Sequence, residues 1–503
     1  MKKHYIVLLL LFILVLNIYG EKLVILHTND HHGRPFGFKE NEIMVGGLPA
    51  RATIINQIRE ENKNVVLLDC GDINDGLFES NLFNAAPDFL GYNYLKYDAM
   101  TLGNHEFYKS LQNLKEQQTE AKFPFLCANI LNKDGSYLAE PYLIIEINGL
   151  KIGIIGLTTT TIEYSAPIAV TNELQIIDEV KVAQQIVDLI KDKVDYIIAL
   201  THLGINKDDN YGSLRLARLV DNIDLVIDGH SHTFLEKPIF VTNEKTKKEV
   251  PVVQANCWGT HIGKAEFDIS DKGLTFLNWE PISIVSTEKD DKVLHDLLSP
   301  YLKEATQLMG EIIGKSDMYY GTETVRIKEN ELASLCVQAM LWYYEKEKPD
   351  FSVTNGGGVR HFLNKGDVKK EDIYNVFPFD NYTVLLELRG ADIINIVEKS
   401  INTKVNTGGY LHFSNNIKIT HNANKSIKQI KLNNKVIEAN KTYRILTNSY
   451  LANGGDSYTE FLNGKKLSIS QKFDREIVVD YIKTKLNGKI KIQITPQIIK
   501  ASK

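Results

Sequence analysis

Five short clusters of histidine, aspartate and asparagine stand at points where apolar runs of the sequence end. They read Asp30-His-His32, Gly71-Asp72, Gly103-Asn-His-Glu106, His202 and Gly229-His-Ser-His232. Seven of the thirteen histidines lie inside or beside these clusters, at positions 27, 31, 32, 105, 202, 230 and 232. In an extended strand residues two apart point to the same face, so the Asp30/His32 and His230/His232 pairs can each present two ligands together.

The side chains of these clusters form a donor set for divalent metal ions. Its members are Asp30, His32, Asp72, Asn104, His202, His230 and His232. Four imidazoles, two carboxylates and an amide, without a thiolate, suit a catalytic rather than a structural site. Seven ligands exceed the needs of one tetrahedral ion, so we expect two divalent cations, such as zinc, manganese or magnesium, that share the Asp72 carboxylate. Such a pair can clamp phosphate oxygens, which predicts phosphoester hydrolysis.

A simpler interpretation of each cluster is structural. Aspartate commonly caps helices, and Gly-His and Gly-Asp pairs suit turns. For one cluster the two interpretations are about equally good, but five clusters at strand ends in one part of the chain favour the metal site.

The clusters follow segments that predict an α/β fold. Between residues 22 and 284, runs rich in valine and isoleucine alternate with polar, helix-compatible stretches. The expected strands cover residues 22–28, 65–69, 99–102, 124–129, 152–157, 195–200, 224–228 and 252–255. Open α/β sheets bind ligands at their strand ends, so these strands are expected to bring the clusters together.

The pattern changes after this region. Thr287 and Asp290 have the spacing of a capping box and predict a helix start. The expected helix places Val293, Leu297, Tyr301 and Ala305 on one face and carries Pro300, which predicts a kink. We therefore expect a catalytic domain over 21–285, a linker helix over 286–312 and a smaller second domain over 313–495.

Residues 1–20 have the pattern of a secretory signal peptide. Lys2 and Lys3 precede an apolar run over 5–16, and Gly20 ends the segment. An uncleaved N-terminal anchor is the alternative, although the run is shorter than the ~20 residues of a membrane span. We expect export to the periplasm or the cell exterior, and no stable membrane insertion after cleavage.

Composition excludes some other classes. Four cysteines, at 70, 127, 257 and 336, are scattered singly and are expected to be ordinary buried residues. A net charge of −5 without a basic run makes long nucleic acid an unsuitable ligand, because its binding needs many lysine and arginine contacts.

In order and local context, the five clusters resemble the calcineurin-like metallophosphoesterases. The second half narrows the resemblance. The stretches 355–360 (NGGGVR), 378–381 (PFDN), 409–413 (GYLHF) and 448–456 (NSYLANGGD) resemble the C-terminal domain of the 5'-nucleotidases. The resemblance implies a four-layer α/β/β/α metallophosphoesterase domain followed by a smaller α/β substrate-specificity domain.

The resemblance also assigns roles to the ligands. It implies one metal held by Asp30, His32, Asp72 and His232, and a second held by Asp72, Asn104, His202 and His230. His105, next to Asn104, matches the family histidine that stabilises the phosphoryl transition state or protonates the leaving oxygen. A histidine of the core is the alternative for His105.

The same family implies substrate contacts in the second domain. Arg360 matches an arginine that meets the phosphate. Phe413 and Tyr450 match two aromatics that sandwich the nucleobase, with Tyr410 as a rival for the first. Asp456 matches a carboxylate near the ribose or base, and Asn381 and Asn415 are further polar contacts. A surface arginine and core aromatics are the alternatives. Metals and base clamp on separate domains imply that turnover requires domain closure.

One position departs from the family. Relatives read Gly-Asn-His-Glu-Phe-Asp, where the final aspartate orients the histidine, but this chain has Tyr108 there. A phenol cannot stabilise an imidazolium as a carboxylate does. This departure predicts a reduced contribution from His105 or a shifted pH optimum.

The leading hypothesis is a monomeric or weakly oligomeric 5'-nucleotidase that releases phosphate from nucleotides for salvage. A 2',3'-cyclic-nucleotide phosphodiesterase with 3'-nucleotidase activity, a UDP-sugar hydrolase and a nucleoside di- and triphosphate hydrolase share the fold. From another class, a nucleotide-binding surface protein that has lost turnover is the alternative, with Tyr108 as its one supporting feature.

Overall fold

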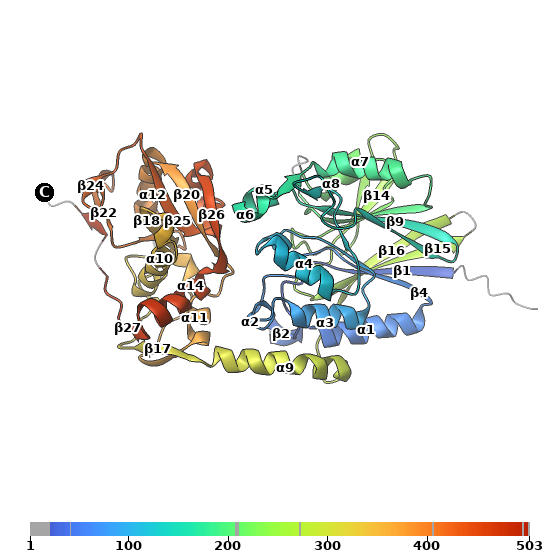
Figure 1. Ribbon diagram of the computed structural model, residues 1–503, viewed down its shortest axis with the longest axis horizontal. Coiled ribbons are helices and arrows are strands. Elements are labelled where there is room, and N and C mark those ends of the chain that lie inside the picture. The colour runs from blue at the N-terminus through green and yellow to red at the C-terminus, as the bar shows by residue number, and fades with distance from the viewer. Residues whose placement is uncertain are drawn as a thin grey trace, which may run out of the picture.

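The computed structural model describes residues 21–40, 42–206, 211–270, 273–404, 407–494 and 497–500. It has two α/β domains, connected by the long helix α9 (Lys292–Met309) that runs along the bottom of Figure 1. The expected signal peptide, residues 1–20, lies outside the described residues.

The first domain is built on two six-stranded sheets. The first has the order β16 (Gly273–Ser283), β15 (His261–Ser270), β1 (Glu21–Thr28), β4 (Asn64–Asp69), β5 (Ala99–Thr101), β6 (Phe125–Leu126). The second has the order β13 (Ile239–Thr242), β14 (Glu249–Val253), β12 (Leu225–Ile227), β11 (Tyr196–His202), β9 (Leu150–Thr158), β8 (Tyr142–Ile147). In the first sheet β1, β4, β5 and β6 are parallel, and β15 and β16 add antiparallel strands at one side. In the second sheet the four central strands are parallel, and the outer strands β13 and β8 are antiparallel.

Strand alternation explains how the two sheets stack. On β1, Leu23 and Ile25 pack into a core shared with Ile154 and Ile198 of the second sheet. The intervening residues of β1 face the other way, toward the helices of the first sheet. Helices α1 (Leu48–Glu61), α3 (Ala86–Leu95) and α4 (Leu111–Glu120) cover the first sheet, and α7 (Glu179–Ile190) and α8 (Ser213–Leu219) cover the second. The four-layer α/β/β/α expectation is confirmed.

Shorter elements complete this domain in the loops between the layers. They are β2 (Phe38–Glu40), β3 (Ile43–Val45), α2 (Phe78–Asn81), β7 (Ile130–Asn132), α5 (Ile162–Ser165), α6 (Ile168–Thr171) and β10 (Leu174–Ile176). Among them, α5 and α6 extend toward the second domain, where α6 contacts β26 (Lys465–Phe473) (Figure 1).

Helix α9 differs from its sequence prediction in start and in face. It begins at Lys292, where the Asp291 side chain accepts a hydrogen bond from the Leu294 amide, and not at Thr287. Leu294, Leu298 and Ala305 are its buried residues, whereas Val293 and Leu297 are 60% and 46% exposed. In the first turns of α9, the buried face is therefore shifted by one residue from the face that the sequence predicts. The buried side of α9 packs on α1 and α3.

The second domain contains a five-stranded sheet between helices. Its order is β21 (Leu411–Phe413), β18 (Phe351–Asn355), β25 (Thr442–Asn448), β20 (Tyr382–Arg389), β26. The helices are α10 (Glu331–Tyr343), α11 (Lys370–Val376), α12 (Gly390–Asn402), α13 (Ser449–Ala452) and α14 (Asp474–Asp480). A three-stranded sheet contains β19 (Gly366–Lys369), β17 (Ile312–Ser316) and β27 (Lys489–Ile490). A four-stranded sheet contains β24 (Lys435–Val436), β23 (Ile427–Leu432), β22 (Ile417–His421) and β28 (Ile498–Lys500).

An apolar contact joins the two domains. The Phe78 side chain of α2 lies in the same hydrophobic cluster as residues of the second domain, and its ring centroid is 5.5 Å from that of Tyr374. The Nζ of Lys370 lies 4.1 Å from the Phe78 ring centroid. Within the described residues, no helix combines the length and apolar character that a membrane span requires.

Candidate functional site

The loops after β1, β4, β5 and β12, together with the last residue of β11, His202, carry the five polar clusters to one edge of the paired sheets. Three overlapping groups of side chains there are close enough to bind cations. They are Asp30/His32/His232, His32/Asp72/His105 and Asp72/His202/His230. Nε2 of His202 is 3.1 Å from Asp72 Oδ2 and 3.2 Å from Asn104 Oδ1. The structure thus brings together all seven ligands expected from the sequence, with Asp72 between two groups.

Two of the histidines are held through the ring nitrogen that faces away from the cluster. Nδ1 of His32 is 3.1 Å from the carbonyl oxygen of Asn74, and Nδ1 of His202 is 2.6 Å from that of Cys70. A carbonyl accepts a hydrogen bond, so each Nδ1 carries the proton and leaves Nε2 free as a ligand. This arrangement is typical of metal-binding histidines.

The backbone of the site is strained at most of its ligands. Asp30, His32, Asp72, His230 and His232 all have left-handed φ values, between 47° and 75°. Non-glycine residues rarely adopt this conformation, and such strain concentrates at functional sites. The strain indicates that the fold places these side chains for a purpose other than stability.

A buried carboxylate joins two of the ligand loops. Glu106 accepts hydrogen bonds from the amides of Asp72 at 2.9 Å and Gly103 at 2.7 Å. A Cβ at Gly103 would lie 2.1 Å from the Asp72 carboxylate, so only glycine allows this approach. The role of Glu106 was not assigned from the sequence, although it is part of the motif.

Charge at the site favours cations. Burial alone would raise the pKa of Asp72, but His202 and His105 hold it well below its usual range. Burial opposes the charge on His202, yet Asp72 and Asp30 raise its pKa to about 10. A pocket that attracts a proton this strongly holds excess negative charge, which a divalent ion can compensate in place of the proton. The donor set, its orientation and its charge therefore fit divalent metal ions.

Two histidines near the clusters have other partners. The ring of His31 lies between Asp88, at 2.9 Å, and Arg51, at 3.0 Å. Nε2 of His27 accepts a hydrogen bond from the Trp279 indole at 2.9 Å. Both rings are fully buried. These contacts explain why neither histidine belongs to the metal-ligating groups.

His105 and Tyr108 occupy the edge of the cluster that faces the second domain. Nδ1 of His105 is 3.1 Å from Oδ2 of Asp75, and its Nε2 is 3.9 Å from Asp72 Oδ2. The Tyr108 hydroxyl accepts a hydrogen bond from Asn104 Nδ2 at 2.8 Å. A reduced contribution of His105 to catalysis was expected because position 108 lacks a carboxylate. In the structure, Asp75 supplies a carboxylate from another loop.

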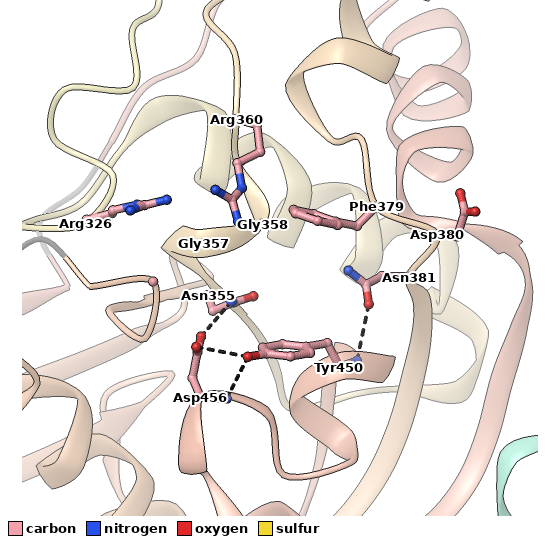
Figure 2. A pocket seen from close by; sticks show the side chains of 11 residues that line it. Arg326, Asn355, Gly357, Gly358, Arg360, Phe379, Asp380, Asn381, Tyr450 and Asp456 are labelled. Carbon is pink, nitrogen blue, oxygen red and sulfur yellow. Dashed lines mark hydrogen bonds between the residues drawn. The ribbon is translucent and has the colours of Figure 1, made fainter. Parts of the chain in front are cut away.

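A cavity of about 590 Å³ in the second domain is a separate feature. Its lining consists of Arg326, Asn355, Gly357, Gly358, Arg360, Phe379, Asp380, Asn381, Gly408, Tyr450 and Asp456. Four residues expected from the sequence, Arg360, Asn381, Tyr450 and Asp456, are among them. As Figure 2 shows, hydrogen bonds connect Asn355, Asp456 and the Tyr450 hydroxyl on one side, and the two arginines lie across from them.

Two expected substrate contacts are not at this cavity. Phe413 is 3% exposed and packs in the hydrophobic core of the second domain, because β21 turns it inward. The Asn415 amide oxygen accepts a hydrogen bond from Gln497 at 2.9 Å, away from the cavity lining. Tyr410, the rival of Phe413, is half-buried and follows the cavity-lining Gly408 by two residues.

The cavity also contains residues that the sequence analysis did not single out. Phe379 is 42% exposed and stacks under the Arg360 guanidinium, 5.0 Å from ring centroid to Cζ. Arg326 comes from the stretch before α10. Phe379 lies inside the motif over 378–381 and could have been noticed there, whereas nothing around Arg326 distinguishes it from a surface arginine.

The fold and the polar site define the class of protein. Residues 23–234 match the family model of the calcineurin-like phosphoesterases, and residues 312–463 match that of the 5'-nucleotidase C-terminal domain. The chain is therefore a metallophosphoesterase with the two-domain arrangement of a phosphoric monoester hydrolase, and the family uses divalent metal cofactors.

Curated relatives identify the family within this class. The chain is 32% identical to the protein UshA of Yersinia enterocolitica and 30% identical to a 5'-nucleotidase of Vibrio cholerae. Each comparison covers 92% of this chain and 90% of the relative. The chain belongs to the 5'-nucleotidase family.

Solved structures agree with this placement. The 5'-nucleotidase precursor of Thermus thermophilus is 26% identical, with a TM-score of 0.64 over 96% of this chain and 100% of the other. A putative 5'-nucleotidase of Staphylococcus aureus, solved with α-ketoglutarate, is 21% identical, with a TM-score of 0.73 over 95% of this chain and 100% of the other. The second likeness concerns the fold alone.

Proposed function

We propose that the protein is a dinuclear-metal 5'-nucleotidase that releases phosphate from nucleoside monophosphates. The observation that carries this proposal is the combination of two sites. A cation-attracting cluster centred on Asp72 lies in one domain, and a cavity lined by two arginines and exposed aromatics lies in the other. The cluster suits the hydrolysis of a phosphoester, and the cavity suits the binding of a nucleotide.

The seven ligands would hold two ions in the division that the family resemblance implies. Asp30, His32, Asp72 and His232 would hold one, and Asp72, Asn104, His202 and His230 the other. When bound, the ions supply positive charge for the phosphate oxygens and activate water as the nucleophile. Asp72, present in two of the cation-binding groups, is the proposed shared ligand.

The chain's own side chains would bind and orient the substrate. Arg360 presents a guanidinium fork that matches phosphate oxygens. Tyr450 is 46% exposed, and its hydroxyl is fixed by Asp456 at 3.1 Å, so its ring can stack on a nucleobase. Tyr410 is the proposed second aromatic, because the core position of Phe413 leaves that ring without an open face.

His105 is the proposed proton donor to the leaving nucleoside oxygen. A nucleoside alkoxide leaves poorly without a proton, and a positioned acid typically contributes about 10²–10⁴-fold. Burial alone would lower the pKa of His105, but Asp72 and then Asp75 raise it to about 9. Asp75 is not among the proposed metal ligands, so its carboxylate favours the protonated imidazole independently of the ions.

We also propose that the protein is exported and acts in nucleotide salvage. The basic and apolar pattern of residues 1–20 supports export. Phosphate release outside the cytoplasm would convert a nucleotide into a nucleoside that a cell can import.

Chromatographic analysis of the products formed from AMP, 2',3'-cyclic AMP, UDP-glucose and ATP, with assays of free phosphate and bound metal in the same sample, tests the proposal. We expect about two divalent ions per chain and the highest kcat/KM for AMP. Preferred hydrolysis of UDP-glucose or cyclic AMP would assign one of the related activities instead. Bound nucleotide without hydrolysis of any of these substrates, whichever divalent metal is supplied, would identify a binding protein and contradict the proposal.

A further inference from the structure

A buried aspartate stands next to the proposed acid histidine. Asp75 is 4% exposed and lies in the loop after β4, three residues beyond Asp72. Its φ is 59°, a left-handed value. The following glycine touches the metal-ligand loop so closely that a Cβ on Gly76 would lie 1.5 Å from the His32 carbonyl oxygen. The position of the Asp75 carboxylate is thus fixed relative to the ligands.

The contact between Asp75 and His105 orients the imidazole. Oδ2 of Asp75 is 3.1 Å from Nδ1 of His105, which must donate because a carboxylate only accepts. The opposite ring nitrogen, Nε2, faces Asp72 at 3.9 Å and the ring of His32, whose centroid is 4.6 Å away. Asp75 therefore selects the ring orientation that presents Nε2 to the proposed phosphate position.

Tyr108 does not provide this contact. Its hydroxyl accepts from Asn104 Nδ2 at 2.8 Å, and only its ring approaches His105, with 4.4 Å between centroids. The family resemblance implies that relatives with aspartate at this position orient the histidine from there. In this chain the carboxylate comes from the loop that precedes the motif, and not from the turn that follows it.

The second domain also contacts this carboxylate. Tyr382 interacts electrostatically with Asp75, and its ring packs edge-on against Tyr108 with 5.5 Å between centroids. Asp75 therefore has a neighbouring side chain in each domain. A buried carboxylate that is hydrogen-bonded to His105 and enclosed by these neighbours is held in a single place, as an orienting group requires.

We propose that Asp75 is the positioning residue of His105 and that it replaces the aspartate that relatives carry at the position of Tyr108. This inference rests on the proposed function, because it concerns the histidine of that reaction. It assigns to Asp75 an orienting role and no direct contact with the substrate.

A double-mutant cycle with Tyr108→Asp tests the proposal. In the wild-type background Asp75→Asn should lower kcat for AMP by roughly 10–100-fold, while KM and metal content stay within about twofold. In the Tyr108→Asp background the same change should lower kcat by less than about threefold, because the carboxylate at 108 takes over. In the His105→Asn background it should have no further effect.

The controls separate this role from a structural one. Asp188→Asn, an isosteric change of an exposed residue on α7, should match wild type in every measurement. Equal losses from Asp75→Asn in all three backgrounds, or a loss of bound metal, would overturn the proposal. If wild type hydrolyses AMP and Asp75→Asn is unaffected, this inference alone fails. If wild type releases no phosphate from any nucleotide, the proposed function fails first.

Discussion

Backbone strain at the proposed metal ligands separates them from ordinary loop residues. The left-handed conformation at Asp72 and His230 costs of the order of 1 kcal/mol for each such residue, and the packed sheets beneath must offset it. The glycines around these ligands allow loops to approach closely, as at Gly229, where a Cβ would lie 2.9 Å from the His202 ring. The fold itself therefore fixes the geometry of these side chains, which favours tight binding.

Substitutions at Asp72 and Tyr450 should affect different kinetic constants. Asp72→Ala removes the proposed shared ligand, so we expect phosphate release from AMP to fall by at least about 10³-fold and bound metal to fall below two ions. Tyr450→Ala removes an exposed ring from the cavity and should raise KM about tenfold with little change in kcat. Steady-state kinetics and metal analysis check both, and equal losses of kcat would contradict the separation of roles.

The sequence predicts the metal cluster better than the cavity for a physical reason. Each ligand cluster follows a strand whose apolar pattern identifies its end, so Asp30 or His202 can be placed from local information. Whether Phe413 points to a cavity or into the core depends on the packing of β21, which no local pattern determines. The role of Asp75 could not be predicted for the same reason, since its contact with His105 joins two different loops.

The sequence predicts the boundaries of fully buried strands more accurately than those of partly exposed elements. The central strands β1, β4 and β11 match the predicted runs within two residues, because buried parallel strands are continuous apolar segments. The long hairpin of β15 and β16 was not predicted, since its partly exposed strands mix polar and apolar residues. In α9, Val293 has the spacing expected of a buried residue, yet Leu294 is the one buried.

Helix α14 gives a prediction for stability against pH. Its first residue, Asp474, is buried, and burial raises the pKa of its carboxyl to about 7. In the unfolded chain this group ionises near pH 4, so between about pH 4 and 7 the folded state binds the extra proton. Wild-type stability should therefore fall as the pH rises through this window. The Asp474→Asn variant has no carboxyl group at this position, so its stability should not fall in this window.

Denaturant unfolding of both proteins at pH 5 and pH 8 measures this effect. The free energy of unfolding of Asp474→Asn minus that of wild type should be larger at pH 8 than at pH 5 by on the order of 3 kcal/mol. This difference corresponds to about two pKa units. Thr383 hydrogen-bonds the Asp474 carboxyl and can also bond an amide, so packing should be preserved. An unchanged difference between the two proteins would show that Asp474 does not titrate in this window. Asp188→Asn on the exposed surface of α7 is the matched control.

At the scale of the whole molecule, the cavity and the metal cluster do not share a lining. All described residues around the cavity belong to the second domain. The second-domain residues beside His105 and Tyr108 include Tyr382, Ser449 and Lys466, and of this set only Asp380 also lines the cavity. A nucleotide held in the cavity must bring its phosphate to the cluster, so one domain has to move relative to the other.

This motion can be measured with two spin labels. Asp188→Cys on α7 and Glu398→Cys on α12 place labels on exposed sites of opposite domains, and the four native cysteines are buried and would react poorly. Pulsed EPR should show that the distance distribution between the labels changes when AMP and metal are added together. Metal alone should leave the distribution unchanged, since the cluster lies within one domain. Labels at Asp188 and Lys151, both in the first domain, are the control and should not move. An identical distribution with and without nucleotide in an active, doubly labelled enzyme would contradict the required domain motion.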